Sequence, residues 1–192
     1  GMDNVVATPH LGASTTEAQE KVALQVAEQM ADFLISGAVT NALNMPSVTA
    51  EEAPRLAPYM KLAEQLGSFA GQMTRSAIKS VTIEYEGHAA GLNCKPLTAA
   101  ALKGLLSPQL ETVNMVSAPV IANQRGIDVA EVRHDRDSDY QTLIRLTVTT
   151  ENQTRSVAGT LFGGDKPRVV NVKGVPMEAE LGPHMLYITN ND

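Results

Sequence analysis

The sequence predicts an α+β fold in which helices pack on one face of a mostly antiparallel sheet, preceded by one long N-terminal helix. Apolar residues recur at helical spacing through the first two thirds of the 192 residues, whereas β-branched residues dominate from Val129 onward. Short turn sequences separate the later strands. Such turns join antiparallel neighbours, because a parallel crossover needs about a dozen residues or more.

The long N-terminal helix is predicted over residues 15–36. Ser14, followed three residues later by Glu17, matches a capping box, and Gly37 can end the helix. Its broad apolar stripe consists of Val22, Ala23, Val26, Ala27, Met30, Phe33 and Leu34. A stripe of this width must dock on another surface, for which a second copy of the protein is one candidate.

Three further helices are predicted at about residues 56–74, 97–106 and 113–125 from apolar residues three or four apart. Pro54 and Pro58 frame the approach to the first of them. The strands are predicted near residues 81–86, 129–134, 142–149, 154–162, 168–173, 175–180 and 185–189.

Charge and composition exclude several function classes. The formal net charge is −6 and the basic residues are scattered, so nucleic acid is not an expected partner. No apolar run approaches the roughly 20 residues of a membrane helix, and no signal peptide is recognisable. We therefore expect a cytoplasmic protein that does not bind membranes.

No metal site is predicted. Cys94 is the single cysteine and cannot form a Cys-rich site. His134 stands near four charged residues, Asp135, Arg136, Asp137 and Asp139, but no second histidine lies at ligand spacing. This charged segment is therefore interpreted as a solvated turn.

His10 is the candidate catalytic residue, because it lies between Pro9 and Gly12 just before the first helix. A neutral imidazole can take or give a proton near neutral pH. Gly12 and Ala13 leave room for a flat ligand to approach the backbone. The alternative interpretation is that His10 is a solvent-exposed loop residue without a catalytic role.

The segment 4–19, NVVATPHLGASTTEAQ, closely resembles the segment that carries the catalytic histidine in D-2-hydroxyacid dehydrogenases, particularly the phosphoglycerate dehydrogenases of serine biosynthesis. Residues 38–44, 118–127 and 159–163 are similar to the long-form members of that family. The resemblance implies that His10 shuttles a proton while hydride passes between substrate and NAD. It also implies that the cofactor site includes His10, Leu11, Gly12 and Ala13.

The same resemblance implies a domain organisation. Residues 1–46 correspond to the C-terminal segment of the catalytic domain, and 47–184 to the intervening allosteric substrate-binding domain. Residues 185–192 correspond to the start of a link to an ACT domain that senses serine. The family's dinucleotide loop, substrate-binding arginine and histidine-orienting carboxylate would all lie upstream. We therefore expect a catalytically incomplete regulatory and oligomerisation fragment of an NAD-dependent enzyme, with no NAD bound to the fragment alone.

The expected partners are the catalytic and ACT domains of the parent enzyme, a second copy of this chain, and a phosphorylated small-molecule effector. Lys166, Arg168 and Lys173 form the candidate anion site. Arg168 and Lys173 are an odd number of residues apart, so they face opposite sides of a regular strand unless the turn swings one of them round. The simpler interpretation is that these three charged residues keep the protein soluble and protect the edge of the sheet from pairing with another strand. A ligand-free structural spacer and a serine-dehydratase-like accessory domain are the alternative functions.

Overall fold

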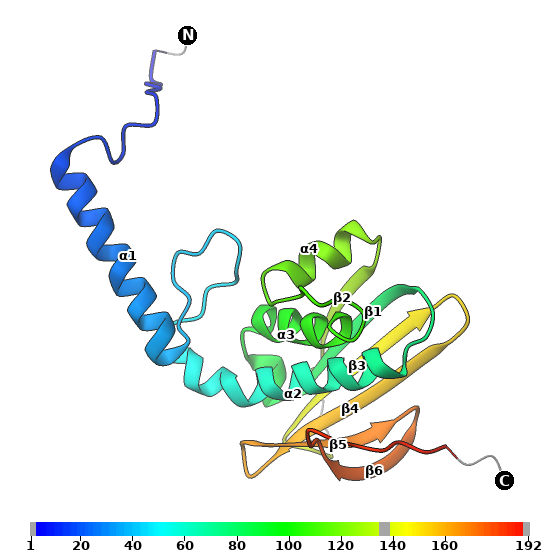
Figure 1. The fold of residues 1–192 in the computed structure, drawn as a ribbon. Coiled ribbons are helices and arrows are strands. Elements are labelled where there is room, and N and C mark those ends of the chain that lie inside the picture. Colours follow the sequence, from blue (N-terminus) through cyan, green and yellow to red (C-terminus); the bar gives the residue numbers. More distant parts are fainter. Residues whose placement is uncertain (1–2, 135–138, 190–192) are drawn as a thin grey trace.

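The computed structural model describes residues 3–134 and 139–189. Its elements are α1 (Thr16–Ser36), α2 (Glu52–Met73), β1 (Ile78–Gly87), η1 (His88–Gly91), α3 (Cys94–Leu106), α4 (Ser117–Gln124), β2 (Asp128–His134), β3 (Thr142–Thr150), β4 (Thr154–Phe162), β5 (Lys166–Val172) and β6 (Val175–Glu180). The predicted α+β class is confirmed, since α2 and α3 cover one face of the sheet while α1 extends away from the body (Figure 1). The predicted turn at 135–137 and the last three residues of the predicted link lie outside the described residues.

The sheet has six strands in the order β2-β1-β3-β4-β5-β6. All neighbours are antiparallel except β1 and β2, which run parallel with Ser80 beside Asp128 and Glu86 beside His134. The parallel pair is possible because α3 and α4 form a long crossover between its strands. As a result, β2 and β6 are the two edges of the sheet.

The core lies between the sheet and the layer of α2 and α3. Val81, Ile83 and Tyr85 alternate along β1 and are fully buried, as the pattern in the sequence predicts. Leu62 and Leu66 of α2 are equally buried. Burying such side chains stabilises the fold by roughly 1.5 to 3 kcal/mol each.

Three glycines bring the backbones of α2 and α3 into contact. A Cβ atom on Gly67 would overlap the carbonyl oxygen of Ala101, one on Gly71 that of Leu105, and one on Gly104 that of Glu64. Only glycine fits at these three positions, because backbone atoms of the facing helix leave no space for a methyl group. The two helices therefore pack more closely than side chains would allow.

Helix α2 begins earlier than the prediction of residue 56. Thr49 Oγ1 accepts a hydrogen bond from the backbone N–H of Glu52 at 3.2 Å, and Glu52 Oε2 accepts one from the N–H of Thr49 at 3.1 Å. This reciprocal capping box fixes the first turn. Pro54 fits in that turn, and Pro58 lies inside the helix, where it removes one backbone donor.

We expect Thr49→Ala to lower the free energy of unfolding by about 1 kcal/mol, because it removes this cap. Glu51→Ala is the matched control, since the adjacent carboxylate makes no capping hydrogen bond. Urea unfolding followed by circular dichroism measures both variants. Equal loss in the two would contradict the role of the cap.

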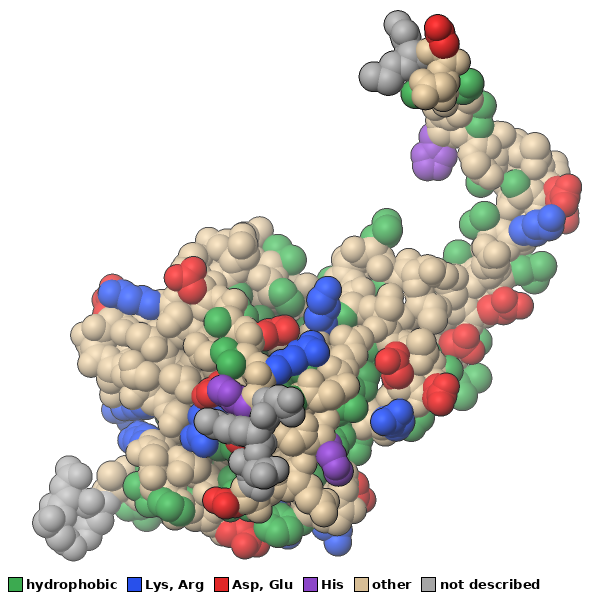
Figure 2. Space-filling model, turned by 180° about the vertical axis from the view of Figure 1, so that it is seen from behind, with side chains coloured by type: hydrophobic (Ala, Val, Ile, Leu, Met, Phe, Trp, Pro, Cys, Tyr) green, Lys and Arg blue, Asp and Glu red, His purple; other side chains and the backbone are tan. Residues whose placement is uncertain are grey.

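Helix α1 is confirmed in extent, but its N-cap differs from the prediction. Thr15 Oγ1 accepts from the N–H of Ala18 at 3.2 Å, whereas the Ser14 hydroxyl donates to the carbonyl oxygen of Leu11. Gly37 ends the helix in the left-handed region, with φ at 77°. Not one residue of α1 is buried, and hydrophobic side chains project along this arm (Figure 2).

Two further predictions require correction. Helix α4 starts at Ser117 rather than near 113, because Asn114 Oδ1 accepts from the N–H groups of Val116 and Ser117 and holds the preceding residues in a turn. The strand predicted at 185–189 does not form. Gly182 and Pro183 interrupt the strand pattern, and Tyr187 instead packs on α2.

Candidate functional site

The segment that carries His10 lies at the far end of α1, away from the α+β body (Figure 1). His10 and Leu11 are exposed, and a Cβ built on Gly12 would meet no atom within 4 Å. Within residues 3–134 and 139–189, no hydrogen bond or ion pair joins the His10 side chain to another group. The catalytic and cofactor roles of residues 10–13 therefore stay predictions.

The predicted cluster of Lys166, Arg168 and Lys173 is not brought together. Arg168 is adjacent to the core residue Val169, so the alternation along β5 places Arg168 on the face away from the helices. Its Nη1 lies 2.9 Å from Glu180 Oε2, close enough for an ion pair although the geometry does not make a hydrogen bond.

Lys173 lies instead on the helical side of the sheet. It occupies the turn after β5 with φ at 52°, and its Nζ lies 5.5 Å from the centre of the Tyr187 ring. Lys173 and Arg168 therefore lie on opposite faces of the sheet. In this arrangement Lys166, Arg168 and Lys173 do not point toward a common anion.

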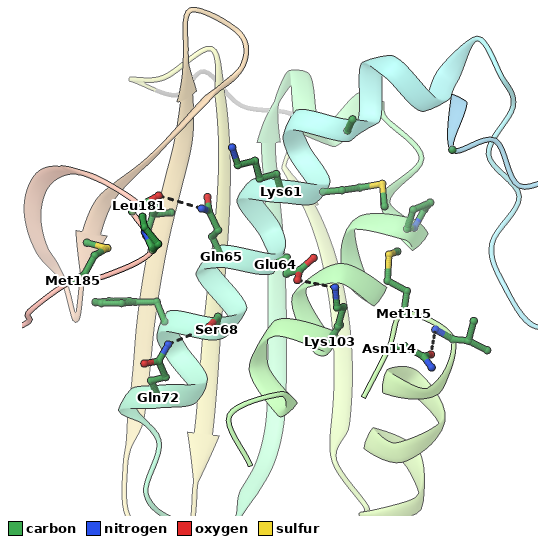
Figure 3. A pocket seen from close by; sticks show the side chains of 18 of the residues that line it. Lys61, Glu64, Gln65, Ser68, Gln72, Lys103, Asn114, Met115, Leu181 and Met185 are labelled. Atoms are coloured by element: carbon green, nitrogen blue, oxygen red, sulfur yellow. Dashed lines mark hydrogen bonds and ion pairs between the residues drawn. The ribbon is translucent and has the colours of Figure 1, made fainter. Parts of the chain in front are cut away.

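A groove of about 1440 Å³ runs along the outer side of α2. Lys61, Glu64 and Gln65 project from α2, between Lys103 on α3 and Leu181 in the segment after β6 (Figure 3). Five basic side chains line the groove, namely Lys61, Arg75, Lys103, Arg155 and Lys173. The only acidic side chain in this lining is Glu64, whose Oε1 pairs with Lys103 Nζ at 2.7 Å. The groove is therefore positively charged in a chain whose net charge is −6.

Three of these cations gather near the C-terminus of α2. The Arg155 guanidinium donates to the carbonyl oxygen of Met73, the last residue of the helix, and Arg75 follows two residues later. The backbone N–H of Lys173 donates to the carbonyl oxygen of Ser156, the neighbour of Arg155. The negative end of the helix dipole favours cations at this place. We call Arg75, Arg155 and Lys173 the cationic end of the groove.

The rest of the groove is largely apolar. Methionine and phenylalanine side chains line it, including Met60, Phe69, Met73, Met115 and Met185. Thioether side chains adapt to ligands of different shape. Gln65 Nε2 donates to the carbonyl oxygen of Leu181 at 3.1 Å, and Phe69 meets the Tyr187 ring edge-on with the ring centres 5.8 Å apart. These contacts hold residues 181–187, which we call the C-terminal tail, against α2.

The opposite face of the sheet has mixed charges. Figure 2 shows acidic, basic and histidine side chains interspersed on this side. Glu84 Oε1 lies 2.8 Å from His134 Nε2, and Glu84 Oε2 lies 3.7 Å from Arg145 Nε. Because these charges offset one another, the face lacks the single sign that characterises the groove.

Two titratable groups are buried at α3, namely Tyr85 of β1 and Cys94, the first residue of the helix. The Tyr85 hydroxyl lies 2.8 Å from Thr98 Oγ1, which donates to Glu131 Oε1 at 2.6 Å. Burial raises the pKa of Tyr85 and outweighs the lowering by its hydrogen bond with Thr98. Burial also raises the pKa of Cys94, so its thiol stays protonated and lacks the character of a nucleophile.

In the described part of the chain, no group of three or more His, Cys, Asp or Glu residues is arranged to hold a metal ion. Nor does any helix there combine the length and apolar character needed to cross a membrane.

Comparison with known proteins matches residues 55–173 to the D-3-phosphoglycerate dehydrogenase intervening domain. Curated relatives include D-3-phosphoglycerate dehydrogenases from Synechocystis sp., 39% identical over 98% of this chain, and from Bacillus subtilis, 36% identical over 98%. A third, from Methanocaldococcus jannaschii, is 37% identical over 90%. The matches cover 34%, 36% and 33% of these relatives, so the chain spans about a third of their length.

Proposed function

The chain belongs to the family of the D-3-phosphoglycerate dehydrogenase intervening domain, and from this premise we propose that it is a regulatory part of an NAD-dependent D-3-phosphoglycerate dehydrogenase. Its α+β body would bind a small phosphorylated acid. The observation that carries this proposal is the cationic end of the groove, formed by Arg75, Arg155 and Lys173, because the one acidic residue of the lining, Glu64, is paired with Lys103.

The chemistry of these three side chains suits a phosphate or carboxylate. Guanidinium groups donate in a planar fork that matches both anions, and an ammonium adds a compact charge. The apolar lining beyond them lowers the local dielectric constant and strengthens the attraction. This supports a ligand with an anionic end and a short carbon skeleton, as 3-phosphoglycerate and phosphoserine have.

The position of the cationic end suggests how binding is communicated. Lys173 also contacts Tyr187 in the C-terminal tail. A ligand that draws the ammonium toward its phosphate weakens this cation–π contact, which is worth about 0.5 to 2 kcal/mol. The ligand would therefore bind with different affinity when the tail is docked on α2 and when it is released, and would shift the populations of these two arrangements.

His10 has a separate role in this proposal. In the whole enzyme, it would move the proton that accompanies hydride transfer, with Leu11, Gly12 and Ala13 beside the nicotinamide. NAD would supply the hydride chemistry when bound. His10 is exposed, and no hydrogen bond or ion pair joins its side chain to another described residue. In this proposal the acid that orients it would belong to the rest of the enzyme.

Calorimetric titration of 3-phosphoglycerate, phosphoserine and inorganic phosphate into the chain tests the anion site. We expect Arg155→Gln and Lys173→Gln each to weaken binding about tenfold or more, because each removes a charge-assisted contact. Lys166→Gln is the matched control, since it removes the same charge from the opposite face. Circular dichroism checks that Arg155→Gln, which also loses the Met73 contact, remains folded.

The results separate three possibilities. If binding is lost in Lys166→Gln or Arg168→Gln and kept in Lys173→Gln, the anion site lies at β5 instead. If the unmodified chain gives no heat at millimolar ligand, the body is a structural spacer. The contacts of Gln65 and Phe69 with the C-terminal tail favour the spacer as the second candidate, because side chains of the chain itself hold the tail against α2.

A further inference from the structure

The two edges of the sheet differ in how they are protected against pairing with another strand. On β6, Pro176 removes a backbone donor, and Glu178 and Glu180 add two like charges. These are devices that prevent edge-to-edge association. On β2, five of the seven residues are exposed, the strand has no proline, and its charged residues Asp128, Glu131 and Arg133 include both signs. The charges of β2 can therefore attract those of a second copy, whereas β6 has acidic residues only.

We propose that β2 pairs antiparallel with β2 of a second copy, joining two six-stranded sheets into one. Antiparallel edge-to-edge pairing requires a two-fold axis perpendicular to the sheet, which keeps the helices of both copies on the same side. Residues that pair must then point to the same face. This condition restricts the registers that are available.

One register matches the side chains of β2. Glu131 and Arg133 point to the helical face, because they lie beside Ile83 and Tyr85 of β1. With the two-fold axis at Val132, Glu131 of each copy lies opposite Arg133 of the other, and Val132 lies opposite itself. The pairing then contains two attractive charge pairs and a central contact between β-branched side chains.

The neighbouring registers are worse. Centring the axis on Glu131 places two carboxylates opposite each other, and centring it on Arg133 does the same with two guanidinium groups. Like charges directly opposite each other destabilise a strand pair. The charges of β2 therefore select the register centred on Val132. Because the paired segment is short, the dimer should be weak and dependent on protein concentration.

Disulfide trapping tests the register directly. In Val132→Cys the two new cysteines face each other across the axis, with Cα atoms about 4.5 to 5.5 Å apart, within the range that a disulfide can bridge. Cys94 does not interfere, because it is fully buried. Mild oxidation of the 192-residue chain should therefore give a covalent dimer that a reductant reverses.

Ala130→Cys is the matched control on the same face of the same strand. Its two copies are four residues apart in this register, about 14 Å along the strand, too far for a disulfide. If Val132→Cys stays monomeric under oxidation, or if Ala130→Cys cross-links equally fast, the proposal is wrong.

Charge reversal provides a second, independent readout. Adding Arg133→Glu to Val132→Cys should slow cross-linking at least tenfold, and adding Glu131→Arg as well should restore it, because the pair is then exchanged rather than broken. Glu178→Arg on β6 should change nothing. Thermal melts check folding, since Glu131→Arg also loses the Thr98 contact. If the rate of cross-linking does not change with these charge reversals, the proposal fails. It also fails if light scattering shows that the Arg133→Glu variant is still a dimer, because another surface such as α1 then joins the copies.

Discussion

Gly104→Ala should lower the free energy of unfolding by about 3 to 5 kcal/mol, a large part of the stability of an ordinary domain. The added methyl group would overlap the Glu64 carbonyl oxygen and lie 2.8 Å from the Ser68 nitrogen. Both obstacles are backbone atoms of α2, so relief requires α2 and α3 to separate. Such separation opens gaps among the leucines that both helices bury.

Urea unfolding followed by circular dichroism measures this effect. Gly91→Ala is the matched control, because a Cβ built there meets nothing within 4 Å and the backbone is not left-handed. It should leave stability within about 0.5 kcal/mol of the unmodified chain. Similar stability of Gly104→Ala and Gly91→Ala would show that the two helices are not in backbone contact.

Alkaline pH should destabilise the protein through Tyr85. Burial raises the pKa of this phenol in the folded state above its ordinary value of 10.0, whereas the unfolded chain ionises near that value. Above pH 10 the unfolded state therefore binds fewer protons than the folded state. The free energy of unfolding falls by about 1.4 kcal/mol per pH unit from this group alone, roughly 2 to 3 kcal/mol by pH 12. Below pH 10 the contribution is constant.

Tyr85→Phe isolates this contribution. The variant loses the hydrogen bond with Thr98, so it should be about 1 kcal/mol less stable at pH 8. Because Phe cannot ionise, its stability should fall less steeply above pH 10. Urea unfolding of both proteins between pH 8 and 12 gives the two slopes. Parallel curves throughout this range would contradict the assignment to Tyr85.

Much of the fold follows from local patterns in the sequence. The alternation of Val81, Ile83 and Tyr85 and the helical spacing of α1 determine their elements almost alone. The start of α2 is also recognisable, since Thr49 and Glu52 match a capping box, but the prediction takes Pro54 and Pro58 as the approach to the helix and does not use this box. The strand predicted at 185–189 failed for a different reason. Whether Tyr187 joins a strand or packs on Phe69 depends on the surface that folding brings nearby.

The candidate site was much harder to predict. The three residues of the cationic end are 80 and 18 positions apart along the chain, at 75, 155 and 173, and belong to separate elements. No window of sequence contains them together. The predicted cluster of Lys166, Arg168 and Lys173 is close in sequence, yet a strand separates neighbours onto two faces. Lys173 is the only residue common to that cluster and to the cationic end of the groove.

The glycine contact between α2 and α3 has a mechanical consequence. Backbones that touch cannot slide or tilt past each other without losing that fit, so the two helices behave as a single rigid plate. A displacement at one end of α2 is therefore carried undiminished to the other, some 30 Å away for a helix of 22 residues.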